Sequence, residues 1–336
     1  MRHVAVLAAA LSVLAACTRA GSSDAPIVVK FSHVVAVDTP KGRAAELFAR
    51  RAAELTGGRV RVEVHPNSTL YKDREEIEAL QLGAVQMLAP SLSKFGPFGV
   101  REFEVFDLPF LFEDQDALRR VTEGEVGRAL LRRLEPKGIM GLAYWDNGFK
   151  SFSAGRPLRV PEDFRGLRMR IQSSAVIEAQ MRALGALPQV LAFSDVYPAL
   201  RAGVVDGAEN PISNLYTQRM HEVQRHLTLT DHGYLGYAVI VNKRFWEGLP
   251  GGVRAELRRA MEEATAYANR TAREKNEADL AQVRAAGTTE IHVPTAAERA
   301  ALKRALVPVH AQMAARLGPE LVAAVHAAAG FDPERP

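Results

Sequence analysis

Cysteine is nearly absent from this chain, which has a single one, Cys17, in 336 residues. One cysteine cannot form a disulfide within the chain, so no covalent cross-link contributes to its stability. No stretch after the first residues approaches about 18 consecutive apolar residues, so no later segment is expected to span a membrane. Basic side chains barely outnumber acidic ones, 43 to 39, and no Lys/Arg block is present, which argues against nucleic acid as a partner.

Catalytic and cofactor motifs are also missing. The sequence has no GxxxxGK[ST], no GxGxxG after a strand, no HExxH and no GxSxG. His221 and His226 are five residues apart, which places them on different faces of a helix and gives zinc no local site. We therefore expect no enzyme activity, no cofactor and no metal. A secreted α/β hydrolase, with a serine–histidine–carboxylate set brought together only by folding, remains the alternative.

The first residues have the pattern of an export signal. Arg2 is followed by a nearly continuous apolar run, Val4 to Leu14, which is too short for an ordinary membrane span. We expect residues 1–16 to be a signal peptide. The small residues before Cys17 resemble a lipobox, in which the cysteine is lipid-modified, and the alternative is a plain cleaved signal. Both interpretations export the protein, and Thr18 to Pro26 would then be a polar tether.

Along the rest of the chain, short apolar runs alternate with segments of helical period. This alternation predicts an α/β fold with mostly parallel strands covered by helices. The pattern runs from residue 27 to 145 and restarts near residue 166, which predicts two lobes with a cleft between them. Expected helices include one after Thr39, one capped by Asp73, one over 116–134 and one of some 35 residues ending near Ala286. At 1.5 Å per residue the last would exceed about 50 Å and reach across both lobes.

Two arginines interrupt the strand expected at Gly166 to Gln172. Strands covered on both faces should be apolar on both, yet Arg168, Arg170 and Gln172 share one face. Arg168 comes early and can reach the surface. Arg170 lies at the carboxyl end, where open α/β sheets bind ligands. Arg170 is therefore either a ligand-binding guanidinium or the partner of a structural carboxylate.

Three further clusters place polar side chains at the ends of expected strands. Asn147 and Lys150 follow one strand, where a turn with a solvated lysine is the alternative. Asn210 follows an Asp-Gly turn and is also suited to cap the next helix. His33 ends the first strand, beside the positive pole of the first helix. Each of these residues also has an ordinary structural explanation.

Five segments in a fixed order carry a resemblance to a known family: Lys30–His33, Gly166–Gln172, Ala192–Tyr197, Val205–Pro211 and His221–Gln224. Over residues 27–329 the sequence resembles the periplasmic solute receptors of TRAP transporters, specifically the C4-dicarboxylate (DctP) branch. The resemblance implies a two-lobed fold like that of periplasmic binding proteins. Lobe I would comprise residues 27–146 plus about 230–272, and lobe II residues 147–229 plus about 273–330.

The family pattern also implies site residues. In this family an arginine in the corresponding strand pairs with the substrate carboxylate, and it matches Arg170. A second basic residue falls at Lys150, the cleft asparagine at Asn210 and the aromatic side chain at Phe193. Pro90 stands where the sialic-acid branch carries a glutamate, which argues against sialic acid. We further expect these cleft residues: Asn147, His33, Ser91, Lys94, Gln172, Asn214 and Tyr237.

The expected function is that of a periplasmic receptor, a monomer without enzyme activity. It would bind succinate, fumarate or malate between the lobes and deliver the ligand to the small and large subunits of a membrane permease. One arginine could also anchor a 2-oxo acid or a sugar acid, so a receptor for another carboxylate is the first alternative. A ligand sensor read by a membrane signalling protein is another.

Overall fold

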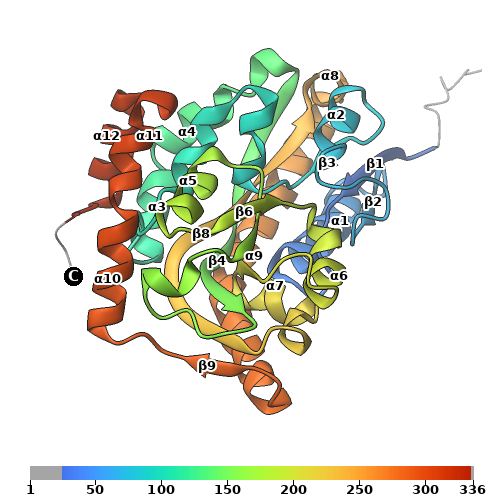
Figure 1. Cartoon of the computed structure of the whole chain (residues 1–336). Helices are drawn as coiled ribbons and strands as arrows, with labels where there is room; N and C mark the ends of the chain where they lie inside the picture. Colours follow the sequence, from blue (N-terminus) through green and yellow to red (C-terminus); the bar gives the residue numbers. More distant parts are fainter. Residues whose placement is uncertain (1–24, 334–336) are drawn as a thin grey trace, which may run out of the picture.

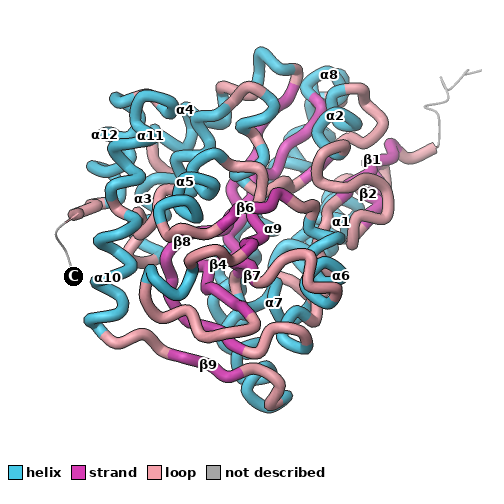
Figure 2. Tube along the Cα trace, viewed as in Figure 1, coloured by secondary structure: helices cyan, strands magenta, loops and turns pink. Residues whose placement is uncertain are grey.

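The computed structural model describes residues 25–333, so the predicted signal peptide and Cys17 lie outside the described residues. Strands occupy the centre and helices surround them (Figures 1 and 2). The predicted α/β architecture is confirmed. No helix within residues 25–333 combines the length and the apolar character that crossing a membrane requires.

The described strands form one mixed sheet in the order β2-β1-β3-β8-β4-β7-β5-β6, with β9 paired to β8. The strands β1 to β3 are mutually parallel, as are β5 to β7, and the antiparallel pair β4–β8 joins these two groups. The sequence predicted a mostly parallel sheet in each of two lobes, whereas the structure has one continuous sheet in which an antiparallel pair joins two parallel groups. The strands are β1 (Ile27–Ser32), β2 (Val60–His65), β3 (Met87–Leu88), β4 (Ile139–Ala154), β5 (Arg168–Ile171), β6 (Leu187–Val190), β7 (Gly207–Asn210), β8 (His226–Asn242) and β9 (Glu290–His292).

The two central strands are unusually long. β4 has 16 residues and β8 has 17, against a typical strand of about five or six. They pair along most of their length, with register shifts at Gly141/Ala143, Asp146/Gly148 and Lys150/Phe152. β8 pairs with β3 on one side and β4 pairs with β7 on the other, so this pair connects the two parallel groups.

The helices pack on both groups of strands. They are α1 (Pro40–Leu55), α2 (Glu76–Gln81), α3 (Gln115–Thr122), α4 (Glu125–Arg132), α5 (Ala175–Ala183), α6 (Val196–Arg201), α7 (Ile212–Thr217), α8 (Lys243–Gly248), α9 (Gly251–Ala286), α10 (Ala296–Leu306), α11 (Pro308–Leu317) and α12 (Pro319–Ala329). Short 3₁₀ turns include η1 (Leu92–Lys94), η3 (Arg101–Asp107) and η6 (Phe193–Asp195). In Figure 1, α10 to α12 stack on one side of the molecule and α1 lies on the other.

Local sequence signals explain where the main helices begin and end. The Thr39 side chain accepts a hydrogen bond from Gly42 N at 3.1 Å and Pro40 follows at the first turn, as expected for the start of α1. α9 has 36 residues and ends at Ala286, and the next residue, Gly287, has a φ of 65° that suits glycine. Its length confirms the predicted long helix, which contacts α1, α7 and β4.

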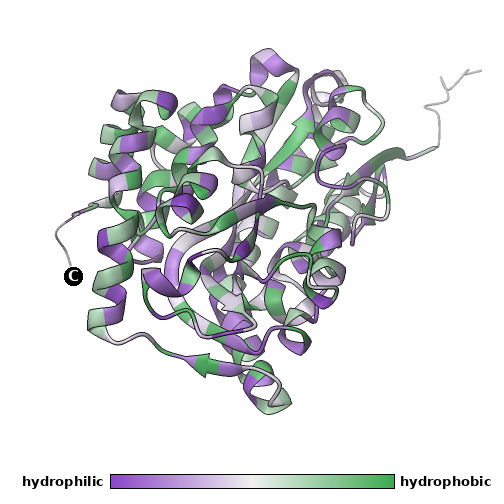
Figure 3. Cartoon of the chain, viewed as in Figure 1, coloured by the Kyte–Doolittle hydropathy of each residue, from purple (hydrophilic) through white to green (hydrophobic). Residues whose placement is uncertain are grey.

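The hydrophobic core consists of separate clusters. One contains Val29, Phe48 and Trp145 and packs β1, α1 and α9 together. Another contains Phe152 and Met169 and packs β5 against α5 and α10. Figure 3 shows hydrophobic residues along the central strands and hydrophilic residues at intervals along the outer helices.

Several local predictions were wrong. Asn147 and Lys150 lie within β4 rather than after a strand, and Asn210 lies in β7, with Pro211 rather than Asn210 at the N-cap position of α7. The segment expected to form one helix over 116–134 is divided into α3 and α4 at Gly124, whose backbone is extended (φ −78°, ψ −176°). A Cβ added to Gly124 would lie 2.3 Å from Arg120 O. Asp73 does not cap α2, whose first flanking residue is Glu75 and which has no side-chain cap. A tertiary contact occupies the Asp73 carboxylate instead.

Candidate functional site

Arg170 is buried in the interior of the protein. Arg168, two residues earlier on β5, is exposed and makes two bonds to the Asp206 carboxylate, at 2.7 and 3.0 Å, as its early position predicted. Arg170 is only 2% exposed. Its Nε and Nη2 donate to Leu191 O at 3.1 and 2.9 Å, and its Nη1 has no hydrogen-bond partner among the described residues. The Phe193 ring centroid lies 5.9 Å from Arg170 Cζ.

Arg170 lines a concavity of about 810 Å³, which we call the cleft. One wall comes from residues 73–98 and the other from residues 170–192. Ser91 Oγ donates to Gln172 Oε1 across it at 2.5 Å, and Asp73 Oδ2 accepts a hydrogen bond from Phe193 N at 2.6 Å. The walls are therefore in direct contact, and the groups behind them are shielded from solvent.

Lys94 is neutralised by two acids on its own wall. It is bonded to the carboxylate of Asp73 and donates to Glu76 Oε1 at 3.1 Å. Burial opposes its charge, but the two carboxylates leave the pKa of Lys94 above its ordinary value. Burial likewise opposes the charge of Asp73, whose pKa is nevertheless lowered by Lys94 and, to a lesser degree, by Arg170. Lys94 and Asp73 thus form a buried ion pair beside the cleft.

Lys150 is also paired. Its Nζ donates to Glu209 Oε1 at 2.6 Å, and both side chains are 1% exposed. The other Glu209 oxygen lies 2.9 Å from His232 Nε2, while Thr230 Oγ1 lies 2.7 Å from His232 Nδ1. Burial alone would raise the pKa of Glu209, but Lys150 and His232 lower it to about 2. The role of Lys150 toward a ligand stays a prediction.

Lys41 is a fourth buried cation, and the sequence did not single it out. It lies in the first turn of α1 and is 1% exposed. Its Nζ donates to Ala89 O at 2.9 Å and lies 3.7 Å from the centroid of the Tyr237 ring. Burial, and then the charge of Lys94, lower the pKa of Lys41 from 10.5 to about 7. A lysine at the positive end of a helix is unfavourable, and that was the signal available in the sequence.

The predicted asparagines are buried, and each has a polar side-chain atom that makes no hydrogen bond to the described residues. Asn147 Nδ2, Asn210 Oδ1 and Asn214 Oδ1 have no hydrogen-bond partner among the described residues. Asn276 on α9 positions this region, since its Nδ2 donates to Asn147 O at 2.6 Å and its Oδ1 accepts from Ser213 N at 2.8 Å. Buried polar groups in native proteins are nearly always hydrogen-bonded, so these atoms are suited to receive a polar ligand.

His33 and Tyr237 complete the predicted set. Burial, and then the charge of Lys41, lower the pKa of His33 to about 3, so the imidazole is neutral at physiological pH. Tyr237 forms a β-bridge with Ser91 and carries Lys41 on its ring. Every residue that the sequence predicted for the site is buried: His33, Ser91, Lys94, Asn147, Lys150, Arg170, Gln172, Phe193, Asn210, Asn214 and Tyr237.

Sequence reasoning missed the residues that act as internal partners: Asp73, Glu76, Glu209 and His232. No clear local signal marked Glu209 or His232, because each stands beside another polar residue of its strand, Asn210 or Asp231. Within residues 25–333, no group of three or more His, Cys, Asp or Glu side chains is arranged to hold a metal ion.

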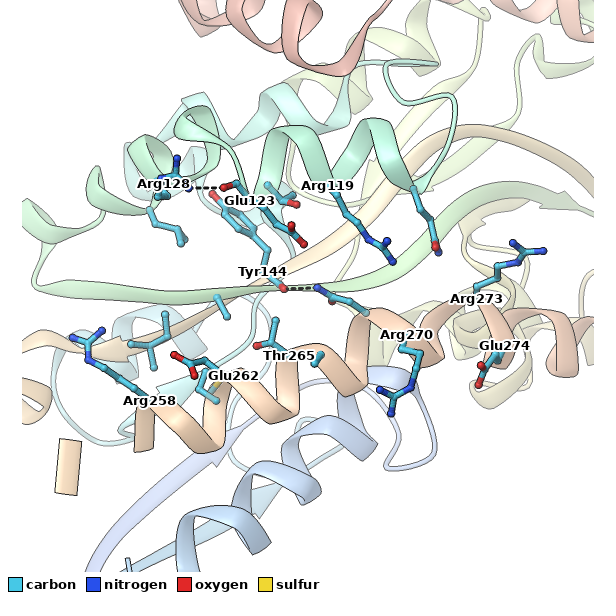
Figure 4. A pocket seen from close by; sticks show the side chains of 18 of the residues that line it. Arg119, Glu123, Arg128, Tyr144, Arg258, Glu262, Thr265, Arg270, Arg273 and Glu274 are labelled. Atoms are coloured by element: carbon cyan, nitrogen blue, oxygen red, sulfur yellow. Dashed lines mark hydrogen bonds between the residues drawn. The ribbon is translucent and has the colours of Figure 1, made fainter. Parts of the chain in front are cut away.

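A second concavity, of about 1020 Å³, lies between α3–α4 and α9, with β4 as its floor (Figure 4). We call it the helix groove. Its charged side chains are exposed: Arg119, Glu123, Arg128, Arg258, Glu262, Arg270, Arg273, Glu274 and Glu277. Arg128 Nη1 donates to Glu123 O at 2.6 Å, and Arg273 pairs with Glu277 at 2.7 Å. Neither the motifs nor the resemblance pointed to these residues.

Comparison with known proteins identifies close relatives. The family described as "Bacterial extracellular solute-binding protein, family 7" (DctP) matches residues 31–317. The chain is 64% identical over 303 residues to the C4-dicarboxylate-binding periplasmic protein DctP of Rhodobacter capsulatus, covering 90% of this chain and 91% of that protein.

Solved structures give the same result. A TRAP periplasmic solute-binding protein from Sulfurospirillum deleyianum with bound succinate superimposes with a TM-score of 0.88 and 46% identity, covering 90% of this chain and 99% of that one. A TRAP periplasmic solute-binding protein from Pseudomonas aeruginosa with bound L-malate has a TM-score of 0.83 and 46% identity, covering 85% of this chain and all of that one, 100%.

Proposed function

Because the chain belongs to the DctP family of bacterial extracellular solute-binding proteins, we propose that it is a receptor for C4-dicarboxylates that serves a TRAP transporter. The relatives bind succinate and L-malate, and the most similar of those described above is a C4-dicarboxylate-binding protein. The family consists of transport receptors, so the protein is not an enzyme.

The observation that carries this proposal is the state of Arg170. It is buried, and among residues 25–333 no carboxylate is hydrogen-bonded to it and one of its nitrogens has no partner. An arginine cannot lose its charge in a protein, so the cost of burying it must be offset by a negative partner. A ligand carboxylate offers that charge and accepts charge-assisted hydrogen bonds, each of which contributes about 1.5–3 kcal/mol.

The lobes, the membrane partner and the location belong to the same proposal. Residues 27–146 plus about 230–272 would form lobe I, and residues 147–229 plus about 273–330 lobe II. The hydrophobic cluster around α1 lies within the proposed lobe I, whereas another cluster joins residues 77–144 to residues 309–329 and so crosses the proposed boundary. The protein would act in the periplasm as a monomer and present its ligand to the small and large permease subunits, either free or anchored through Cys17.

A calorimetric titration tests the ligand class directly. Succinate, fumarate and malate should bind the unmodified protein more tightly than a 2-oxo acid or a sugar acid does. The Arg170→Ala variant should lose most of the affinity for succinate, while the melting temperature of the empty protein should change little. Intact succinate binding by Arg170→Ala would refute the assignment of Arg170. Tighter binding of a 2-oxo acid or sugar acid would identify a receptor for another organic acid.

A further inference from the structure

The buried basic side chains of residues 25–333 fall into two groups. Lys94 and Lys150 each form a hydrogen-bonded ion pair with an internal carboxylate. Lys41 and Arg170 form none, and each donates to a single backbone carbonyl, Ala89 O or Leu191 O. The carboxylates whose charge acts on Lys41 are those of Asp73 and Glu76, and both accept hydrogen bonds from Lys94.

Lys41 and Arg170 are thus buried cations whose charge is not neutralised by a hydrogen-bonded carboxylate of the described residues. A buried charge without a partner is strongly destabilising, and it is offset by a counter-charge or by loss of the proton. Asp73 and Glu76, the two acids whose charge acts on Lys41, are each hydrogen-bonded to Lys94, and His33 is neutral at physiological pH. Two negative charges from outside the protein would offset the two cations, and one dianion carries two charges.

We propose that Lys41 is the second cation of the ligand site and binds the ligand carboxylate that Arg170 does not bind. The inference rests on the proposed function and deepens it, because it assigns the preference for dicarboxylates over monocarboxylates to one residue.

The surroundings of Lys41 suit this role. The Tyr237 ring and the Ala89 carbonyl fix the ammonium group, and one carbonyl uses only one of its three N–H donors. Lys150, the residue expected from the family pattern to bind the second carboxylate, already donates to Glu209, which it shares with His232. Each of the two lysines uses one of its three N–H donors, but the charge of Lys150 is neutralised by Glu209, whereas Lys41 has no hydrogen-bonded acid among the described residues.

The test compares succinate with its monoamide, succinamate, which lacks one charge but keeps nearly the same shape. Lys41→Gln should weaken succinate binding at least tenfold, since a charge-assisted bond is lost. The unmodified protein should prefer succinate to succinamate more than tenfold, and Lys41→Gln should reduce this preference to below about threefold. Arg43→Gln, which removes a charge from an exposed position in the same turn of α1, is the matched control and should retain the preference.

The outcomes separate the two proposals. If the unmodified protein binds no C4-dicarboxylate, the proposed function fails. If it binds succinate and Lys41→Gln binds it equally well with the full preference over succinamate, the role of Lys41 is overturned while the function stands.

Proton uptake on ligand binding gives a second test, which can be measured on the unmodified protein. The titratable and aromatic groups around Lys41 are Lys94, Asp73, Glu76, His33 and Tyr237. Burial and the charge of Lys94 lower the pKa of Lys41 to about 7. In the empty protein at pH 8, Lys41 is therefore mostly unprotonated. A bound carboxylate favours the ammonium form, so succinate binding at pH 8 should take up as much as one proton per ligand. Calorimetry in buffers of different ionisation enthalpy measures this uptake. Its absence in the unmodified protein, or its persistence in Lys41→Gln, would contradict the proposal.

Discussion

The cleft and the helix groove differ in what their charged residues contact. The groove is the larger, about 1020 Å³ against about 810 Å³, and it carries more charged side chains. Those side chains are exposed to solvent and need no further partner. Behind the cleft, the cations are buried, and two of them lack a carboxylate. The unmet electrostatic requirement of buried groups therefore indicates the ligand site better than volume does.

The largest expected effect comes from breaking the buried pair behind the cleft. Glu209→Gln leaves the Lys150 charge buried without its acid, which typically costs about 3–5 kcal/mol. Urea unfolding of the empty protein measures the loss. The control is Glu125→Gln, which removes an exposed partner of Arg128 and Arg132 near the groove and should leave the unfolding midpoint unchanged. If both substitutions lowered the unfolding midpoint equally, the buried ion pair behind the cleft would contribute no more to stability than the exposed pair near the groove.

A second prediction concerns pH. Burial raises the pKa of Asp107 from 3.8 to about 7, although Lys150 opposes the shift. A raised carboxyl pKa stabilises the fold below pH 3.8, and that stability is lost as the pH rises through about 7. Asp107→Asn removes the group that loses its proton. The change in the free energy of unfolding that it causes should therefore be more stabilising at pH 8 than at pH 4, by up to about 4 kcal/mol. The same change at both pH values, measured by urea unfolding, would show that Asp107 is ionised in the fold.

A third prediction separates charge from geometry in the cleft. Arg170→Lys keeps the positive charge but removes the planar fork, so succinate affinity should fall more than tenfold, about 1.4 kcal/mol or more. Arg168→Lys, on the same strand but exposed and paired with Asp206, should bind like the unmodified protein. Isothermal titration of both variants makes the comparison. Wild-type affinity in Arg170→Lys would mean that a point charge suffices.

The smallest effect is expected in the groove. Arg258→Gln and Arg270→Gln, exposed residues of α9, should change succinate affinity less than twofold, because we propose that succinate binds at Arg170 rather than in the groove. The measurement is the same titration. A tenfold loss in either variant would show that the groove takes part in binding.

Local features of the sequence predicted much of the framework. The Thr39 cap, the long helix ending at Ala286 and the break in apolar pattern at Arg170 each depend on residues close together in the chain. Whether Arg170 bonds an internal acid could not be predicted, because the sequence does not show which carboxylates lie near it.

The internal partners were missed for the same reason. Lys150, Glu209 and His232 come from β4, β7 and β8, and they meet only because of the strand order of the sheet. Asp73 was assigned to a cap from its spacing to Glu76, but the tertiary contact with Phe193 N prevailed. Charge pairing across a fold depends on topology, which a local pattern does not contain.

The β4–β8 pair has a consequence for how the protein admits its ligand. In the sheet, this pair lies between β3, which precedes one wall, and β5, which carries Arg170 in the other. Moving the two walls apart would therefore require the hydrogen-bonded pair β4–β8 to bend. Bending is easiest where the register of the pair shifts. The walls are thus not connected by a flexible linker. In the two-lobed receptor that we propose, an open form restrained in this way would lose little orientational freedom on closing, so a larger share of the contact energy would be retained as affinity.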